Sequence, residues 1–519
     1  MTLTREFVAE EQRTYDSRWM VENVLMIKDK ICLSDESYEI LRNLQPELPT
    51  IDLIKFARNE SNKKILKKSV TGGVYTPILR RLKKVIKAQF DYLEDYIQLN
   101  NDKLSIKFCA DAAAIGRGIN IMNIMFSFPH DEKFSMGVNG HFLIGNIEMQ
   151  AENYQTYRLS LGSIFEEIYR IDGMQIIVKG KTIKLEALLT GDMEFLDKIL
   201  AIKPPNSDNP CLWCTCPKNR FHKFNEWVAG LRGQQYVRSI EHARINIGNF
   251  GYVSIPLTSL AFTKTTVDVL HMFLRISDRL EECFVNDIEP IDFQIHGIRG
   301  GDIDRRPVLK RFSTFLDIEC NIKNYLYFEN PNWKSKNLTG LQKLRLFESL
   351  KRSDFLILNQ ILSLDDTPVT PEKRNLVPFL WKNFYSIYSR LAENDINPQT
   401  LREETSEWLR IFLICYKAKK ITPYIHIFCV HLHEQLERIP HLYKFNLQGL
   451  EKYHSFCKRY FHQATNRHFG LRMSQILEKR IRNENYFMKN REFYEEQCDR
   501  KLRGRERRRA VLEIIEAYP

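Results

Sequence analysis

One Cys-x2-Cys pair constrains the fold of this 519-residue chain more than any other feature. Cys211 and Cys214 have the spacing of half a tetrahedral zinc site, and Cys216 lies close by as a spare thiol. The sequence contains no second Cys-x2-Cys pair. If the pair binds zinc, the other ligands must come from a distant segment of the chain.

Histidines at ligand spacing occur only in residues 420–435, KITPYIHIFCVHLHEQ. His426 and His431 form a pair there, and His433 is a third candidate. Because structural zinc sites close with sulfur and imidazole ligands, a Cys2His2 site is the natural combination. Isolated Cys-x2-Cys pairs and paired histidines also occur without metal, so spacing alone leaves both interpretations open.

The composition restricts the class of protein. A net charge of +12 favours a polyanionic partner. Eleven cysteines without even spacing, and no N-terminal signal segment, predict a reduced intracellular compartment without disulfides. Apolar runs stay far below the roughly 20 residues that span a bilayer, so we expect a soluble protein without a membrane partner.

Residues 61–90 form a basic block with nine Lys or Arg and no acid. Gly72, Gly73 and Pro77 interrupt it, and apolar residues at helical spacing follow from Leu79, which predicts a loop and then a basic amphipathic helix. We expect the block to bind DNA phosphates, with a merely solvated helix face as the alternative. The candidate residues are Lys63, Lys64, Lys67, Lys68, Arg80, Arg81, Lys83 and Lys84. A second basic cluster occupies residues 499–510.

Residues 100–200 have the pattern of a mixed α/β domain. We expect the order β-β-β-α-β-α, with strands at residues 104–111, 119–128, 140–149 and 181–192 and helices at 160–171, capped by Ser160, and 193–200. Asp111 and Asp192 then end the first and fourth strands. Beyond residue 216 the pattern is mainly helical.

Two stretches near the C-terminus resemble a known family. KITPYIHIFCVH, followed by LEKYHSFCKRYFHQATNR at residues 450–467, is similar to the catalytic region of the V(D)J recombinase catalytic subunit and of the Transib transposases. In that family the catalytic glutamate follows the second zinc histidine by twenty residues, which here gives Glu451. The zinc cysteines begin nineteen residues after the second catalytic aspartate, which gives Asp192.

The first catalytic aspartate of the family matches Asp111 in IKFCADAAAIGRG, although Ala110 separates it from Cys109. The resemblance implies an α/β fold with an RNase H-like mixed-sheet core and a large, mainly α-helical insertion held by zinc. Asp111, Asp192 and Glu451 would bind two Mg²⁺ or Mn²⁺ ions, which are hard ions that prefer oxygen ligands. Structural zinc would be bound by Cys211, Cys214, His426 and His431, with Cys216 and His433 as bystanders; Lys452, Lys458 and Arg459 would contact phosphates.

The implied organisation has four regions. These are a basic helical DNA-binding and dimerisation region (1–100), the core with both aspartates (101–205), the zinc-binding insertion (206–435) and the catalytic helix with a basic tail (436–519).

The implied activity is metal-dependent nicking of DNA at transposon ends, hairpin formation and strand transfer by a nuclear homodimer. Its partners would be double-stranded DNA, both terminal inverted repeats and target, and the resemblance leaves open an accessory subunit. One alternative is a domesticated, catalytically silent DNA-binding protein, and another is a helical adaptor with a zinc knot.

Overall fold

The computed structural model describes residues 18–503, except 117, 298–299, 364–368, 466–469 and 502. Most of the basic cluster predicted at residues 499–510 therefore lies outside the described residues. The chain divides into two compact units, the first made of Met1–Gly191, Leu257–Leu260 and Leu447–Pro519, and the second of Asp192–Pro256 and Ala261–Asn446. The first unit contains parts of all four predicted regions, with only Leu257–Leu260 from the predicted insertion, and the boundaries of the regions remain a prediction.

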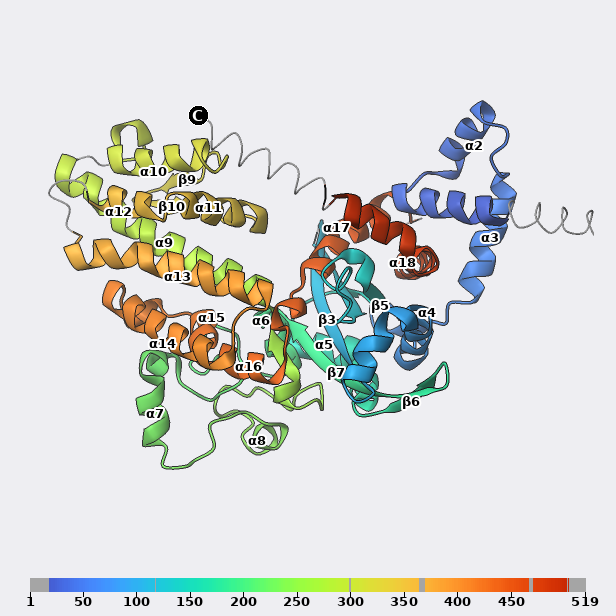
Figure 1. Cartoon of the computed structure of the whole chain (residues 1–519), viewed down its shortest axis with the longest axis horizontal. Coiled ribbons are helices and arrows are strands. Elements are labelled where there is room, and N and C mark those ends of the chain that lie inside the picture. Colours follow the sequence, from blue (N-terminus) through green and yellow to red (C-terminus); the bar gives the residue numbers. More distant parts are fainter. Residues whose placement is uncertain are drawn as a thin grey trace, which may run out of the picture. The chain divides into compact units, whose positions relative to one another are not determined.

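A mixed sheet forms the centre of the first unit (Figure 1). Its strands follow the order β1-β2-β5-β4-β3-β7-β6. β3 and β7 are parallel, whereas β3, β4 and β5 are successive antiparallel neighbours. The strands are β1 (Lys68–Val70), β2 (Gly73–Tyr75), β3 (Lys103–Gly116), β4 (Ile119–Ser127), β5 (His141–Met149), β6 (Gln175–Val178) and β7 (Lys181–Gly191). The mixed α/β class predicted from the sequence is confirmed.

The position of Asp111 in its strand corrects the sequence prediction. β3 does not end at this residue but continues to Gly116, and Asp111 pairs with Asn123 of β4. The small residues after Asp111 lack an alternating pattern, and only their pairing with β4 shows that they are extended. Asp192, by contrast, directly follows β7 as predicted.

Helices from both ends of the first unit pack on the sheet. α4 and α5 contact each other and strands β3, β6 and β7, whereas α17 and α18 contact β2, β3, β4 and β5. Side chains alternate between the two faces of a strand, so Cys109 and Ala113, which pack in the α17–α18 core, lie on the same face of β3 as Asp111. The helices include α2 (Asp35–Leu44), α3 (Ile51–Lys63), α4 (Ile78–Leu99), α5 (Tyr154–Ile171), α17 (Gln448–Gln463) and α18 (Arg472–Lys489), and residues 18–31 are also helical.

Three local predictions in this unit were wrong. α5 begins at Tyr154 with Asn153 as its cap, so Ser160 lies inside the helix. The short strand β6 was missed, because four residues carry too little periodicity. The basic block contains the β1–β2 hairpin and not only a loop; a Cβ at Gly73 would lie 2.2 Å from the Asn146 carbonyl oxygen, so glycine allows β2 to pair closely with β5.

The second unit is mainly helical, as the sequence predicted for this part of the chain (Figure 1). Its helices are α6 (Met193–Ile199), α7 (Phe224–Gly230), α8 (Ile240–Ile245), α9 (Val269–His296), α10 (Pro307–Ile318), α11 (Gly340–Arg352), α12 (Leu356–Leu362), α13 (Pro371–Glu393), α14 (Pro398–Cys415), α15 (Pro423–His426) and α16 (Leu432–Arg438). Its short strands are β8 (Thr265–Val267), β9 (Leu326–Glu329) and β10 (Asn332–Ser335). Among the described helices of either unit, none has both the length and the apolar content to cross a bilayer.

Candidate functional site

The predicted meeting of the cysteine and histidine pairs is confirmed within the second unit. One ligand atom each from Cys211, Cys214, His426 and His431 lies within 4.8 Å of the other three, and all four residues are buried. Neither Cys216 nor His433 belongs to this group, which we call the Cys2His2 cluster.

A local change of helix type aligns the two histidines. In an α-helix, residues five apart point in different directions, because side chains share a face at spacings of three and four. Here Ile427–His431 forms a π-helical turn between α15 and α16, and its wider hydrogen-bonding pattern brings positions five apart onto one side. The His-x4-His spacing therefore fits this turn and not a regular α-helix.

The distances within the Cys2His2 cluster fit a shared tetrahedral ion. Cys214 Sγ and His426 Nε2 are 3.3 Å apart, close to the separation of about 3.5 Å between sulfur and nitrogen ligands of one zinc ion. His431 Nε2 is buried without a hydrogen-bond partner, while its Nδ1 lies 2.9 Å from Glu434 Oε2. A carboxylate on the second nitrogen orients a histidine so that the first can bind metal.

The electrostatics of the Cys2His2 cluster favour a thiolate. Burial raises the pKa of Cys211, but a hydrogen bond with Cys214 and the charges of His431 and His426 outweigh burial, so the pKa lies well below its ordinary value. Burial lowers the pKa of His431, yet the charge of Cys211 raises it to about 9. Since thiolate is the form of cysteine that binds metal, the donor chemistry fits structural zinc.

A second cluster lies in the first unit, where α17 packs on β3. One ligand atom each from Asp111, Glu451 and His454 lies within 4.8 Å of the other two, and we call this group the acidic cluster. Asp111 is 19 % exposed and Glu451 is 38 % exposed, so the carboxylates are accessible to solvent. Glu451 stands in the first turn of α17, as its helical spacing predicted, where the helix dipole favours a negative charge.

A close approach at Gly449 positions Glu451. A Cβ at Gly449 would lie 2.2 Å from Nδ1 of the buried His141 ring in β5, so only glycine allows this approach of α17 to the sheet. The ring is held on both sides, because its Nδ1 lies 2.9 Å from the Gly137 carbonyl oxygen and its Nε2 lies 3.2 Å from Lys107 Nζ. Burial and the charge of Lys107 lower the pKa of His141 well below its usual value.

Asp192 belongs to neither cluster. It is the N-cap of α6 and accepts a hydrogen bond of 2.7 Å from the Phe195 backbone N–H. Partial burial raises its pKa, although the bond from Phe195 and the charge of His271 oppose the rise. A helix-capping role is thus visible for this carboxylate, whereas a metal-binding role remains a prediction.

The predicted DNA-binding residues separate into two groups. The prediction that Arg81 contacts phosphate does not fit the structure, because Arg81 is only 5 % exposed and pairs with the buried Glu484. Its burial reflects the inward face of α4. Lys63, Lys67 and Lys68 pair with Glu60, Glu478 and Glu167, respectively.

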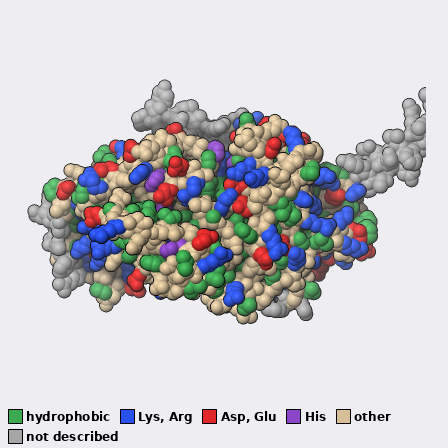
Figure 2. Space-filling model, turned by 90° about the horizontal axis from the view of Figure 1, so that it is seen from below, with side chains coloured by type: hydrophobic (Ala, Val, Ile, Leu, Met, Phe, Trp, Pro, Cys, Tyr) green, Lys and Arg blue, Asp and Glu red, His purple; other side chains and the backbone are tan. Residues whose placement is uncertain are grey.

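Exposed cations remain at the end of α3, where Lys64 is the C-cap, on the outer face of α4 and on α17. Among the described residues, no carboxylate lies within ion-pair distance of Lys64, Arg80, Lys83 or Lys84, all of which are exposed. Lys452 and Lys458 are exposed on α17, and Arg459 is partly exposed. Figure 2 shows basic and acidic side chains interspersed over the face in view, so the basic surplus is spread widely there.

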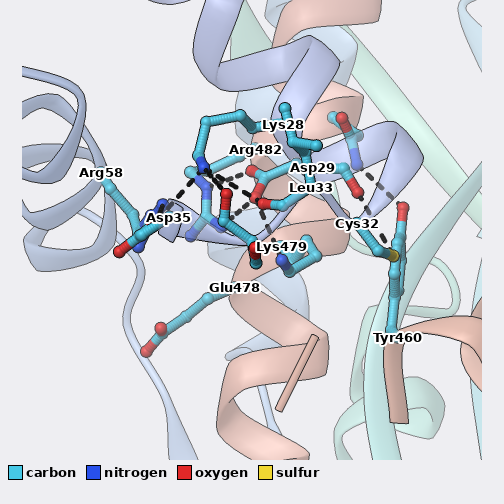
Figure 3. Close-up of polar contacts among 12 residues, drawn as sticks. Lys28, Asp29, Cys32, Leu33, Asp35, Arg58, Tyr460, Glu478, Lys479 and Arg482 are labelled. Atoms are coloured by element: carbon cyan, nitrogen blue, oxygen red, sulfur yellow. Dashed lines mark hydrogen bonds and ion pairs between the residues drawn. The ribbon is translucent and has the colours of Figure 1, made fainter. Parts of the chain in front are cut away.

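A polar network joins α18 to the helix at residues 18–31 (Figure 3). Arg482 donates to both carboxylate oxygens of the buried Asp29, at 2.7 and 3.0 Å, and Lys479 lies 3.3 Å from Asp29. A cavity of about 340 Å³ lies beside the network, lined by Arg58, Lys479 and Arg482 with Asp35 and Glu478. Because carboxylates balance these cations, we interpret the network as structural.

Sequence reasoning missed His454. It follows Glu451 by three positions, and residues at this spacing share a helix face, so a Glu-x2-His pattern was an available signal. The signal is weak alone, because many helices carry such a pair without metal.

No description of a known protein family matches the chain, and no curated protein is significantly similar to it.

Proposed function

We propose that this chain is a metal-dependent DNA transposase or transposon-derived recombinase, related to the V(D)J recombinase catalytic subunit and the Transib transposases. One observation carries the proposal: the spacings behind the resemblance also bring side chains together. Glu451 and Asp111 share one cluster, and Cys211 and Cys214 meet His426 and His431 in another. Chance alignment of short motifs would not require both meetings.

The sheet supports an RNase H-like core. β3 and β7 are parallel neighbours, with Cys109 paired to Thr190. Asp111 and Asp192 each follow these paired residues by two positions, as expected for aspartates on adjacent strands. Glu451 comes from a helix much later in the chain, as the resemblance implies.

In the proposed reaction, Asp111, Glu451 and Asp192 would hold divalent ions. Such ions stabilise negative charge on the attacking and leaving oxygens. Water attacks the phosphorus of one strand, and its 3′ oxygen leaves as a hydroxyl. That hydroxyl attacks a phosphorus of the opposite strand, whose own 3′ oxygen leaves as a hydroxyl on the transposon end. The flanking DNA is then closed as a hairpin. The released transposon end then joins target DNA through its own 3′-hydroxyl.

Other residues bind and position the DNA. Lys452 and Lys458 lie on the exposed side of α17, on the same helix as Glu451, and would contact phosphates. The exposed cations of α4 extend this binding in the way the basic block predicted, without Arg81.

The Cys2His2 cluster would hold zinc and join the start and the end of the second unit, which reduces the entropic cost of ordering this long segment. We also propose that two copies hold two DNA ends, in a nuclear protein.

The test is cleavage of DNA by the full chain. We expect nicks in supercoiled plasmid with Mn²⁺ or Mg²⁺, and hairpins on denaturing gels of end-labelled duplexes. Asp111→Asn and Glu451→Gln should abolish both products and retain salt-dependent duplex binding. Nicking at the wild-type rate by either variant would refute the proposal.

One observation favours the catalytically silent alternative: Asp192 caps α6 and lies outside the acidic cluster. A silent relative would bind duplex DNA with the same salt dependence but would leave plasmids intact with either ion. The same plasmid assay therefore separates the two functions.

A further inference from the structure

His454 occupies the acidic cluster without a role in the three-carboxylate scheme. α17 places it one turn after Glu451, with Nδ1 3.3 Å from Glu451 Oε2 and 3.9 Å from Asp111 Oδ2. The residue is 8 % exposed, and its Nε2 is buried without a hydrogen-bond partner. A nearly buried imidazole thus faces two carboxylates from two different elements.

We infer that His454 is a cation ligand, so that this site binds Mn²⁺ in preference to Mg²⁺. The inference rests on the proposed function, because it takes Asp111 and Glu451 as ligands of a catalytic ion. It adds a nitrogen donor, and with it a selectivity that three carboxylates alone do not provide.

The distances fit ligands of one ion. Around an octahedral ion with ligands at about 2.1 Å, neighbouring donors are about 3 Å apart and opposite donors about 4.2 Å. The separations of 3.3 and 3.9 Å from His454 Nδ1 fall within this span. The alternative is an ion pair within one helix turn, but such a pair needs only Glu451 and does not explain the approach to Asp111.

The donor set determines which ion is favoured. Mg²⁺ prefers oxygen ligands, loses its water reluctantly and is usually bound through one or two carboxylates. Imidazole instead suits first-row transition metals, which bind mixed nitrogen and oxygen sites. Two carboxylates with one imidazole therefore favour Mn²⁺, while the exposure of Glu451 leaves coordination positions open for a phosphate.

The experiment measures ion binding without DNA. Full-length protein loaded with zinc is titrated with Mn²⁺, and free Mn²⁺ is counted by electron paramagnetic resonance; Mg²⁺ is added as competitor. We expect His454→Ala to weaken Mn²⁺ binding by at least about tenfold, and Glu451→Gln should weaken it to a similar extent. His454→Asp, which replaces nitrogen by oxygen, should restore ion binding with the preference shifted toward Mg²⁺.

Two controls guard against misfolding. Ser455→Ala changes the exposed neighbour on α17 and should bind Mn²⁺ as the wild type does. Thermal unfolding without added Mn²⁺ shows whether each variant is folded, and His454→Asp gives a second test if His454→Ala is not. Unchanged Mn²⁺ affinity and selectivity in a folded His454 variant would overturn the inference, even if the protein cleaves DNA. His454-dependent Mn²⁺ binding without any DNA cleavage would instead reject the proposed function.

Discussion

The Cys2His2 cluster and the acidic cluster both join distant parts of the chain, but they differ in their exposure to solvent. In the Cys2His2 cluster, all four residues are buried, and Nδ1 of His431 lies within hydrogen-bond distance of the Glu434 carboxylate. In the second, Asp111 and Glu451 are partly exposed and only His454 is buried. Closed sites with protein ligands are typical of structural metals, whereas catalytic sites keep a position open. The comparison therefore favours a structural role for the Cys2His2 cluster and is consistent with the catalytic role proposed for the acidic cluster.

The largest expected effect is on stability, in the Cys2His2 cluster. Cys214→Ser replaces one of the four donors, the thiol beside the buried His426, by a hydroxyl that binds zinc more weakly. We expect the bound zinc to be lost and the free energy of unfolding of the second unit to fall by about 4 kcal/mol or more, since loss of a structural metal is among the most destabilising changes. Metal analysis and chemical denaturation measure the two quantities.

Cys216→Ser is the matched control for this prediction. The Cys216 thiol is buried close to the cluster but is not part of it, so this variant should keep its zinc. Glu451→Gln should likewise keep both zinc and stability. A wild-type chain without zinc, or a Cys214→Ser variant as stable as Cys216→Ser, would contradict the structural role.

A smaller effect is expected where α17 meets the sheet. In Gly449→Ala the new Cβ would lie 2.2 Å from His141 Nδ1 and 2.9 Å from the Gly137 carbonyl oxygen, so the first turn of α17 must shift. We expect a cost of about 1–3 kcal/mol from overpacking. Because Glu451 moves with this turn, Mn²⁺ binding at the acidic cluster should weaken while the zinc content stays constant.

Gly162→Ala provides the comparison. Gly162 also lies in a helix, α5, but a Cβ there would meet no atom within 4 Å. The substitution should therefore stabilise the first unit by about 0.5–1 kcal/mol and leave Mn²⁺ binding unchanged. Equal effects of the two substitutions would show that the approach at Gly449 does not position Glu451.

The sequence offered the cysteine and histidine pairs as possible partners through their spacing, whereas the meeting of Asp111 with Glu451 was expected only from the family resemblance. Cys211 with Cys214, and Glu451 in the first turn of its helix, follow from local patterns. Arg81 shows what local patterns omit, because its partner Glu484 is 403 positions away and only the packing of α4 and α18 buries the pair. The spacing of three residues places His454 on the same face of α17 as Glu451. Its approach to Asp111, however, depends on how α17 packs on β3, which local patterns do not show.

The smallest expected effect on stability separates two roles of Asp192. Asp192→Ala removes the N-cap of α6 and should cost about 0.5–2 kcal/mol, whereas Asp192→Asn keeps an equally good cap and should cost almost nothing. Plasmid nicking measures the other role: if Asp192 binds a catalytic ion, the amide in Asp192→Asn abolishes cleavage although the chain is fully stable. Wild-type cleavage by Asp192→Asn would leave this residue as a helix cap only and would restrict the chemistry to Asp111, Glu451 and His454.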